Sequence, residues 1–203
     1  MRIACSLGSL LSVEEVLQCT EIASKTGIDS IWIPETWGME NFSMLGAVAN
    51  NTETQKIGSS IINIYSRSPS TIAMGSATTD TLSNGRLILG LGTSSVPIVE
   101  DFHGEKFENP VQRMREYVEI IRLSLAKKQI NYSGKIFDLK NFTLLIDPKR
   151  QLIPIYLAAI NQKMVNLCWE IADGVIFYLR PIDEMKKTIS KMQSQKNIDV
   201  ACQ

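Results

Sequence analysis

Residues 81–92 read Thr-Leu-Ser-Asn-Gly-Arg-Leu-Ile-Leu-Gly-Leu-Gly, and they join the end of a helix to the start of a strand. Asn84-Gly85 ends the helix, because asparagine and glycine tolerate the left-handed backbone that a helix C-terminus uses. The run 86–91 is nearly all apolar, which is expected for a strand covered on both faces and is typical of parallel sheets. The stretch therefore predicts a helix that leads into a buried parallel strand.

The same alternation continues on both sides of this stretch. Ser68-Pro69 has the residues that open a helix, and Ser12 with Glu15 forms a capping box. The expected strands are 2–7, 30–34, 56–62, 86–91, 153–158 and 174–179. The expected helices are 12–25, 41–51, 68–83, one that begins at Pro110, 161–172 and one that begins at Pro181. Two segments interrupt the alternation: 96–108 is expected to be a polar loop, and 130–146 a small inserted β-hairpin.

Six strand–helix units in succession predict an α/β fold with a parallel sheet and right-handed crossovers, in a single domain over 1–203. An open doubly wound sheet and a (β/α) barrel both fit this pattern. The dinucleotide fingerprint G-x-G-x-x-G is missing after the first strand. Gly90 and Gly92 form a G-x-G without a third glycine in place, which is weak evidence of a dinucleotide site. Periodicity alone leaves both architectures open.

Composition excludes several classes of function. Lys plus Arg equals Asp plus Glu, so the formal net charge is zero and nucleic acid is not an expected partner. No apolar run is long enough to span a bilayer, and the N-terminus has no signal-peptide pattern, so a cytoplasmic protein is expected. His103 is the single histidine and no cysteine pair has C-x-x-C spacing, so no metal site is expected.

Several stretches of the chain, in order from residue 1 to about 180, resemble the luciferase-like superfamily. The resemblance is strongest to its reductases that use coenzyme F420, a deazaflavin, such as methylenetetrahydromethanopterin reductase. The matching stretches are 30–37 (SIWIPETW), 65–69 (YSRSP) with 81–92, 101–104 (DFHG) with 113–117 (RMREY), and 155–160 (IYLAAI) with 172–175 (ADGV). The run 65–92 is the most specific match.

The resemblance implies a TIM-type (β/α) barrel, here incomplete at about six of the eight strand–helix units, with its site at the C-terminal ends of the strands. It implies F420 as cofactor, with FMN as the alternative, and a small-molecule substrate. The expected cofactor-binding residues follow the strands in turn: Ser6, Gly8, Ile62, Asn63, Gly92, Thr93, Ser94, Ala159, Ile160 and Asn161.

Glu35 and Thr36 are the expected catalytic residues, because relatives place an acid beside the redox ring after the second strand. Glu35 lies between Trp32 and Trp37, and burial raises a carboxyl pKa toward the range of a useful acid or base. The alternative for Glu35 is a rim residue or a salt bridge. Many relatives have histidine where this chain has Thr36, which weakens any histidine-assisted proton transfer.

Three of the cofactor segments also have a simpler interpretation. Residues 61–63 resemble a segment where relatives carry a non-prolyl cis peptide bulge behind the ring, and the alternative is a plain strand end. Thr93 and Ser94 offer hydroxyl and N–H groups to a flavin-type cofactor, or cap a turn. Asn161 begins a helix whose N-terminus can bind a phosphate, or it only caps that helix. Arg67 is expected either to bind an anion or to pair with a neighbouring acid.

A complete TIM-type barrel has eight strands and about 250 residues, so six strands leave the first and last strands with open edges. A fragment, a short form that closes its edge by association, such as a homodimer, and a rearranged smaller barrel are all possible. Three functions follow: hydride transfer with a deazaflavin, an FMN-dependent monooxygenase, and a shortened flavin-binding protein without turnover.

Overall fold

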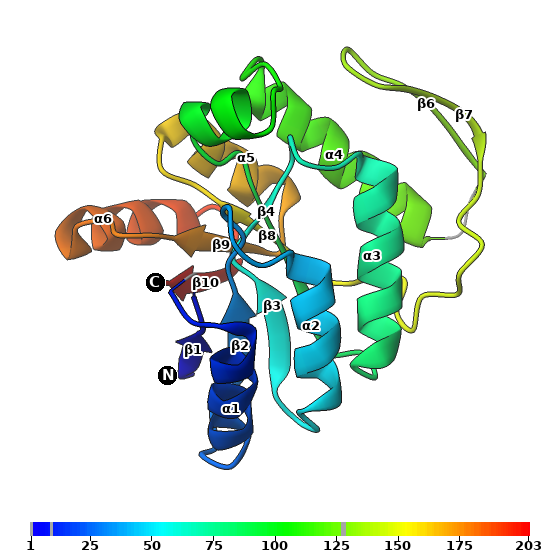
Figure 1. Ribbon diagram of the computed structural model, residues 1–203. Helices are drawn as coiled ribbons and strands as arrows, with labels where there is room; N and C mark the ends of the chain where they lie inside the picture. Colours follow the sequence, from blue (N-terminus) through cyan, green and yellow to red (C-terminus); the bar gives the residue numbers. More distant parts are fainter. Residues whose placement is uncertain (1, 9, 127–128) are drawn as a thin grey trace.

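The computed structural model describes residues 2–8, 10–126 and 129–203, and its centre is a curled parallel sheet (Figure 1). The strands run β1 (Ala4–Ser6), β2 (Ser30–Ile33), β3 (Lys56–Ser59), β5 (Leu87–Gly92), β8 (Ile155–Ala158), β9 (Gly174–Phe177) and β10 (Asp199–Cys202), which is also their order across the sheet. Each strand joins the sheet beside the previous one. This single direction of winding belongs to a TIM-type barrel, because a doubly wound sheet reverses its strand order.

Within the described residues, six α-helices pack outside the sheet. They are α1 (Val13–Ser24), α2 (Asn41–Asn50), α3 (Pro69–Leu82), α4 (Pro110–Leu125), α5 (Gln162–Ile171) and α6 (Ile182–Gln193). The two predicted N-terminal caps are confirmed: Ser12 and Glu15 form a capping box, and Ser68 accepts the N–H of Thr71. In the described part of the chain, no helix has the length and apolarity needed to cross a membrane.

The strands are apolar on both faces because each face meets a different part of the core. Ile31 and Ile33 belong to the large cluster between the sheet and the helices. Trp32, on the opposite face, packs inside the curl with Ile88, Tyr156 and Ile176. The prediction that 86–91 is buried on both faces is confirmed for 87–91, since every residue of β5 is buried, whereas Arg86 lies before the strand and is only partly buried.

The structure differs from the expected elements in three places. The strand expected over 56–62 is divided into β3 and a short β4 (Ile62–Asn63), which pairs with β5. The polar loop expected over 96–108 contains a π-helix, Ile98–Phe102, in which Val99 is fully buried. Residues 199–202 form a further parallel strand, β10, beside β9. The edge strands of the described sheet are therefore β1 and β10.

The predicted hairpin is confirmed as β6 (Ile130–Ser133) paired with β7 (Asp138–Phe142). The carboxylate of Glu116 on α4 holds the turn of this hairpin, because it accepts the N–H groups of Lys135, Ile136 and Phe137. It also accepts the side-chain amide of Gln112. Burial alone raises the pKa of Glu116, but these hydrogen bonds outweigh burial and hold the pKa below its ordinary value.

We expect Glu116→Gln to lower the free energy of unfolding by about 1–3 kcal/mol, because the amide cannot accept all of these N–H donors. A depressed carboxyl pKa stabilises the fold above the unfolded-state value and loses that contribution as pH falls through the folded-state value. The loss should therefore be largest near neutral pH and shrink below about pH 4. Urea melts of both proteins between pH 3 and 7 measure it, with the exposed Glu53→Gln as control. A difference that stays constant with pH would rule out the charge as the cause.

Candidate functional site

The C-terminal ends of neighbouring strands lie at one rim of the sheet, as the strand register shows. Ser6 pairs with Trp32, Asn63 with Gly92, and Ala158 with Ile176. Main-chain hydrogen bonds continue the pairing just beyond the strand ends, since Leu7 N donates to Trp32 O and Ser60 N donates to Ile33 O. The loops that carry the expected site residues therefore leave the sheet on the same side.

A bulge between β3 and β4 is the most distinctive backbone feature of this rim. The Ser60–Ile61 peptide is cis, so the prediction of a non-prolyl cis bulge in this segment is confirmed. The Ser59 hydroxyl donates to Gly90 O and accepts from Gly90 N, both at 2.8 Å. A Cβ at Gly92 would lie 2.5 Å from the side chain of Ile61. Glycine at the end of β5 therefore lets the bulge lie against that strand.

Asn63 is held at the end of β4 with one half of its amide unused. Its Oδ1 accepts the N–H of Tyr65 at 3.0 Å, and its backbone oxygen accepts the hydroxyl of Ser66 at 2.8 Å. The residue is 2% exposed, and its Nδ2 has no hydrogen-bond partner among the described residues. A buried amide nitrogen without an acceptor raises the free energy of the folded protein. A molecule bound at this end of the strand can supply the missing acceptor.

Glu35 lies in a partly buried ion pair, which is the salt-bridge alternative for this residue. Its two carboxylate oxygens accept from Arg67 at 2.7 and 2.5 Å, and Oε1 also accepts the backbone N–H of Asn41. The side chains of Glu35 and Arg67 are 10% and 15% exposed. Arg67 also pairs with Glu40, and the hydrogen bond to Glu35 is the largest factor that raises the pKa of Arg67. Thr36 follows, partly buried, in the same loop.

A continuous set of hydrogen bonds joins this ion pair to the end of β4. Arg67 Nη1 donates to Ser66 Oγ at 3.0 Å, and Ser66 Oγ donates to the backbone oxygen of Asn63. Since Asn63 pairs with Gly92, the structure brings Glu35, Asn63 and the start of the loop at Thr93 to one part of the rim.

The remaining expected residues lie along the same rim with different exposure. Ile62 is fully buried, Gly8, Thr93 and Ser94 are partly buried, and Ser94 has a left-handed backbone with φ of 57°. Ala159 is buried and donates its N–H to Ile176 O, whereas Ile160 is 78% exposed. Asn161 Oδ1 accepts the N–H of Met164 at 3.0 Å, so its side chain caps α5, the simpler of its two interpretations.

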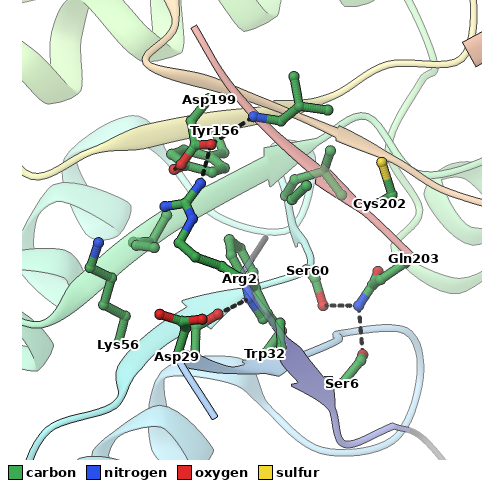
Figure 2. Close-up of a pocket in the computed structure, with 16 residues that line it drawn as sticks. Arg2, Ser6, Asp29, Trp32, Lys56, Ser60, Tyr156, Asp199, Cys202 and Gln203 are labelled. Carbon is green, nitrogen blue, oxygen red and sulfur yellow. Dashed lines mark hydrogen bonds and ion pairs between the residues drawn. The ribbon is translucent and has the colours of Figure 1, made fainter. Parts of the chain in front are cut away.

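A cavity of about 530 Å³ opens between β1 and β10 and extends inside the curl of the sheet (Figure 2). At one end Gln203 Nε2 donates to the hydroxyls of Ser6 and Ser60, at 2.6 and 3.1 Å. At the other end Arg2 and Tyr156 both bond Asp199. Burial and the hydrogen bond to Asp199 raise the pKa of Tyr156. The first end borders the rim, because Ser60 begins the bulge.

Sequence reasoning did not select Ser60 or Gln203, and it left the role of Arg67 open. The signal for Ser60 was present, since it directly precedes the segment expected to bulge. Gln203 gave no signal, because residues 199–203 were not expected to form a strand. The pairing of Arg67 with Glu35 joins residues 32 positions apart and depends on how the loops after β2 and β4 meet.

Residues 1–199 match the family described as luciferase-like monooxygenase. The chain belongs to this family. The 5,10-methylenetetrahydromethanopterin reductase of Archaeoglobus fulgidus is 37% identical over 157 residues, which make up 77% of this chain and 46% of that relative. This luciferase-like chain thus spans about half the length of that relative.

Solved structures show the same fold. The coenzyme F420-dependent tetrahydromethanopterin reductase from Methanopyrus kandleri matches with a TM-score of 0.89 and 23% identity, over 99% of this chain and 65% of that one. An F420-dependent secondary alcohol dehydrogenase, in complex with an F420–acetone adduct, matches with a TM-score of 0.88 and 19% identity, over 99% of this chain and 68% of that one. The luciferase-like chain therefore has the fold of barrel-type reductases.

Proposed function

We propose that this luciferase-like chain binds coenzyme F420 at the rim formed by β4, β5 and β8 and takes part in hydride transfer with a small organic substrate. The unpaired Asn63 amide at the glycine-lined end of β5 carries the proposal, because a deazaflavin ring presents carbonyl acceptors that such a donor can bind. The relatives named as F420-dependent or as methylenetetrahydromethanopterin reductases support the choice of cofactor.

Each expected residue has a specific task in this proposal. Bound F420 supplies the hydride chemistry. Asn63 Nδ2 would donate to a ring carbonyl, and the bulge beside Gly92 would support the ring. Thr93 and Ser94 would donate to polar groups of the ring or its side chain. Ser6, Gly8, Ile160 and Asn161 contribute rim surface on both sides, and the buried Ile62 and Ala159 pack behind it.

We assign Glu35 to positioning rather than to proton transfer. Both oxygens of the Glu35 carboxylate accept from Arg67, and Oε1 also accepts from the Asn41 N–H, so neither oxygen is free to face a substrate. Glu35 instead fixes Arg67 and the loop after β2. The hydroxyl of Thr36, next in the same loop, is the candidate for moving a proton at this rim.

An FMN-dependent monooxygenase is the second candidate, favoured by the description of the family that the chain matches. A shortened flavin-binding protein without turnover is the third. We also propose a cytoplasmic homodimer. Cys5, Cys19, Cys168 and Cys202 are all free, which suits a reducing compartment, and the open edges of β1 and β10 suit self-association.

A titration with F420 and with FMN, followed by the fluorescence of each cofactor, tests the proposed function. We expect F420 to bind in the micromolar range and FMN at least tenfold more weakly. Tight binding of FMN alone would favour the monooxygenase. Binding of neither cofactor would overturn the proposal. F420 binding without turnover of any substrate tested would favour the binding protein.

Asn63→Asp tests the donor directly, because the carboxylate still accepts the N–H of Tyr65 while the donor is lost. We expect F420 affinity to fall at least tenfold, since a carboxylate repels a carbonyl oxygen that the amide would bind. Circular dichroism at the temperature of the titration checks that the variant is folded. Ser76→Ala is the matched control, because Ser76 is buried in α3 and bonds only its own helix. Unchanged affinity in a folded Asn63→Asp protein would remove Asn63 from the site.

A further inference from the structure

The cavity between β1 and β10 has a charged end that lies opposite the rim (Figure 2). Lys56 begins β3 and Asp199 begins β10, while Arg2 and Asp29 come just before β1 and β2. These four charges therefore gather where the strands start, whereas the proposed cofactor position lies where the strands end. The charged end is separate from the rim, although one cavity joins them.

Asp199 is the acid of this end whose charge is already satisfied. It pairs with Arg2 and accepts the hydroxyl of Tyr156. It also accepts the backbone N–H of Val200 at 2.9 Å. Burial raises the pKa of Asp199, but the hydrogen bonds from Arg2 and Tyr156 outweigh burial and hold it below its ordinary value. The Arg2–Asp199 pair is therefore neutral as a unit.

Asp29 and Lys56 remain as two opposite charges at the same end. Asp29 Oδ2 accepts the backbone N–H of Ile3, and Lys56 N donates to the backbone oxygen of Asp29, both at 3.0 Å. Among the described residues, neither of these side chains forms an ion pair. The end thus offers one carboxylate and one ammonium group with a net charge of zero. A head group that carries both signs complements it better than an anion or a cation does.

Aromatic rings form the wall of the cavity beyond these charges. Trp32 and Tyr156 line it with their ring centroids 5.8 Å apart, and aliphatic side chains of β5 and β9 complete the wall. A Cβ at Gly58 would lie 2.5 Å from the Trp32 ring, and a Cβ at Gly174 would lie 2.7 Å from the Tyr156 ring. The two glycines therefore let these rings lie against the sheet, which leaves the centre of the cavity open.

We propose that this end of the cavity binds an aromatic amino acid, with its ring on Trp32 and Tyr156 and its charged groups at Asp29 and Lys56. The ammonium group of the ligand pairs with Asp29, and its carboxylate pairs with Lys56. The cavity of about 530 Å³ has the size of small-molecule sites, which measure roughly 300–1,000 Å³. The inference is independent of the proposed function, because no cofactor takes part in it.

Ligand-observed NMR titration without F420 tests the assignment of charges, with L-phenylalanine and two analogues as probes. 3-Phenylpropionate lacks the ammonium group, and phenethylamine lacks the carboxylate. We expect L-phenylalanine to bind with a Kd of about 100 μM. Each analogue should bind about tenfold more weakly, because each leaves one protein charge without its partner.

Two substitutions should change the preference in opposite ways. Lys56→Gln should weaken L-phenylalanine and 3-phenylpropionate about tenfold without weakening phenethylamine. Asp29→Asn should weaken L-phenylalanine and phenethylamine without weakening 3-phenylpropionate, and its amide oxygen can still accept the N–H of Ile3. Lys163→Gln and Asp183→Asn are the matched controls, since they change the same charges at exposed positions on α5 and α6 away from the cavity.

Ala4→Leu tests the location of the ring. Ala4 lines the cavity, so a larger side chain there should abolish the binding of all three probes. Binding that persists in Ala4→Leu would show that the ligand lies elsewhere. Equal affinity for the three probes, or the same loss in Lys56→Gln and Asp29→Asn for every probe, would overturn the pairing. No binding of L-phenylalanine to the unchanged chain would overturn the site itself, whatever F420 does at the rim.

Discussion

Gly90→Ala is expected to destabilise the protein more than any other single methyl addition at a strand glycine. A Cβ at this position would overlap the backbone carbonyl of Ser59, and a backbone atom cannot rotate away as a side chain can. The clash also separates Gly90 from the Ser59 hydroxyl that bonds both its N–H and its carbonyl. We expect a loss of about 3 kcal/mol in the free energy of unfolding, measured by chemical denaturation.

Gly46→Ala is the matched control for this substitution. Gly46 lies in α2, where an added Cβ would meet only the side chain of Leu82, at an ordinary 3.7 Å. Alanine is a better helix former than glycine, so this variant should be equally stable or more stable by up to about 1 kcal/mol. Equal stabilities for the two variants would show that β3 and β5 are not packed as described.

Arg67→Met is the second large effect, because it leaves the largely buried Glu35 side chain without its counter-charge. Removal of one partner from a buried ion pair typically costs 3–5 kcal/mol, and the partial exposure of this pair places the expected loss near the lower end, at about 3 kcal/mol. The double variant Arg67→Met with Glu35→Gln should recover part of the loss, since no buried charge is then unpaired. Thermal and urea melts of the two variants measure both effects.

Arg115→Met provides the comparison for an exposed pair. Arg115 bonds Glu170 with similar geometry, but these side chains are 31% and 58% exposed. Solvent screens such a pair, so the expected loss is below about 1 kcal/mol. A loss for Arg67→Met no greater than that for Arg115→Met would contradict the role of the Glu35–Arg67 pair in holding the loop after β2.

Most of the fold was predictable because its signals are local. Ser12 with Glu15, Ser68 with Pro69, and Asn84 with Gly85 mark helix ends through contacts within a few residues. The choice between an open sheet and a barrel was not local, since both use the same alternation. The strand order decides it, and the order depends on which strands pair across the whole chain.

The elements that sequence did not predict have weak or long-range causes. Residues 199–202 read Asp-Val-Ala-Cys, a short mixed run, and they become a strand because β9 offers a free edge. Arg86 was assigned to a strand on its position alone. In the structure its guanidinium donates to the backbone oxygens of Ala49, Thr52 and Gln55, which lie at the end of α2 and in the loop that follows it. No local pattern shows that an arginine has this task.

The site was predictable as a row of residues but not as a set of contacts. The rule that parallel strands end at one rim put the residues after the strands on the same side of the sheet, and the register, in which Asn63 pairs with Gly92, agrees. The partner of Glu35 could not be read from the sequence, because an acid beside tryptophans is compatible both with a free acid or base and with an ion pair. The loop geometry after β2 decides between these two alternatives.

Hydrogen exchange measured with and without F420 tests most directly the claim that the strand ends form one cofactor site. The account predicts slower exchange in 6–8, 60–66, 91–95 and 158–162 when F420 is bound, and unchanged exchange in α1 and in the β6–β7 hairpin. Protection confined to the opening between β1 and β10 or to the hairpin, or no protection at saturating F420, would contradict it.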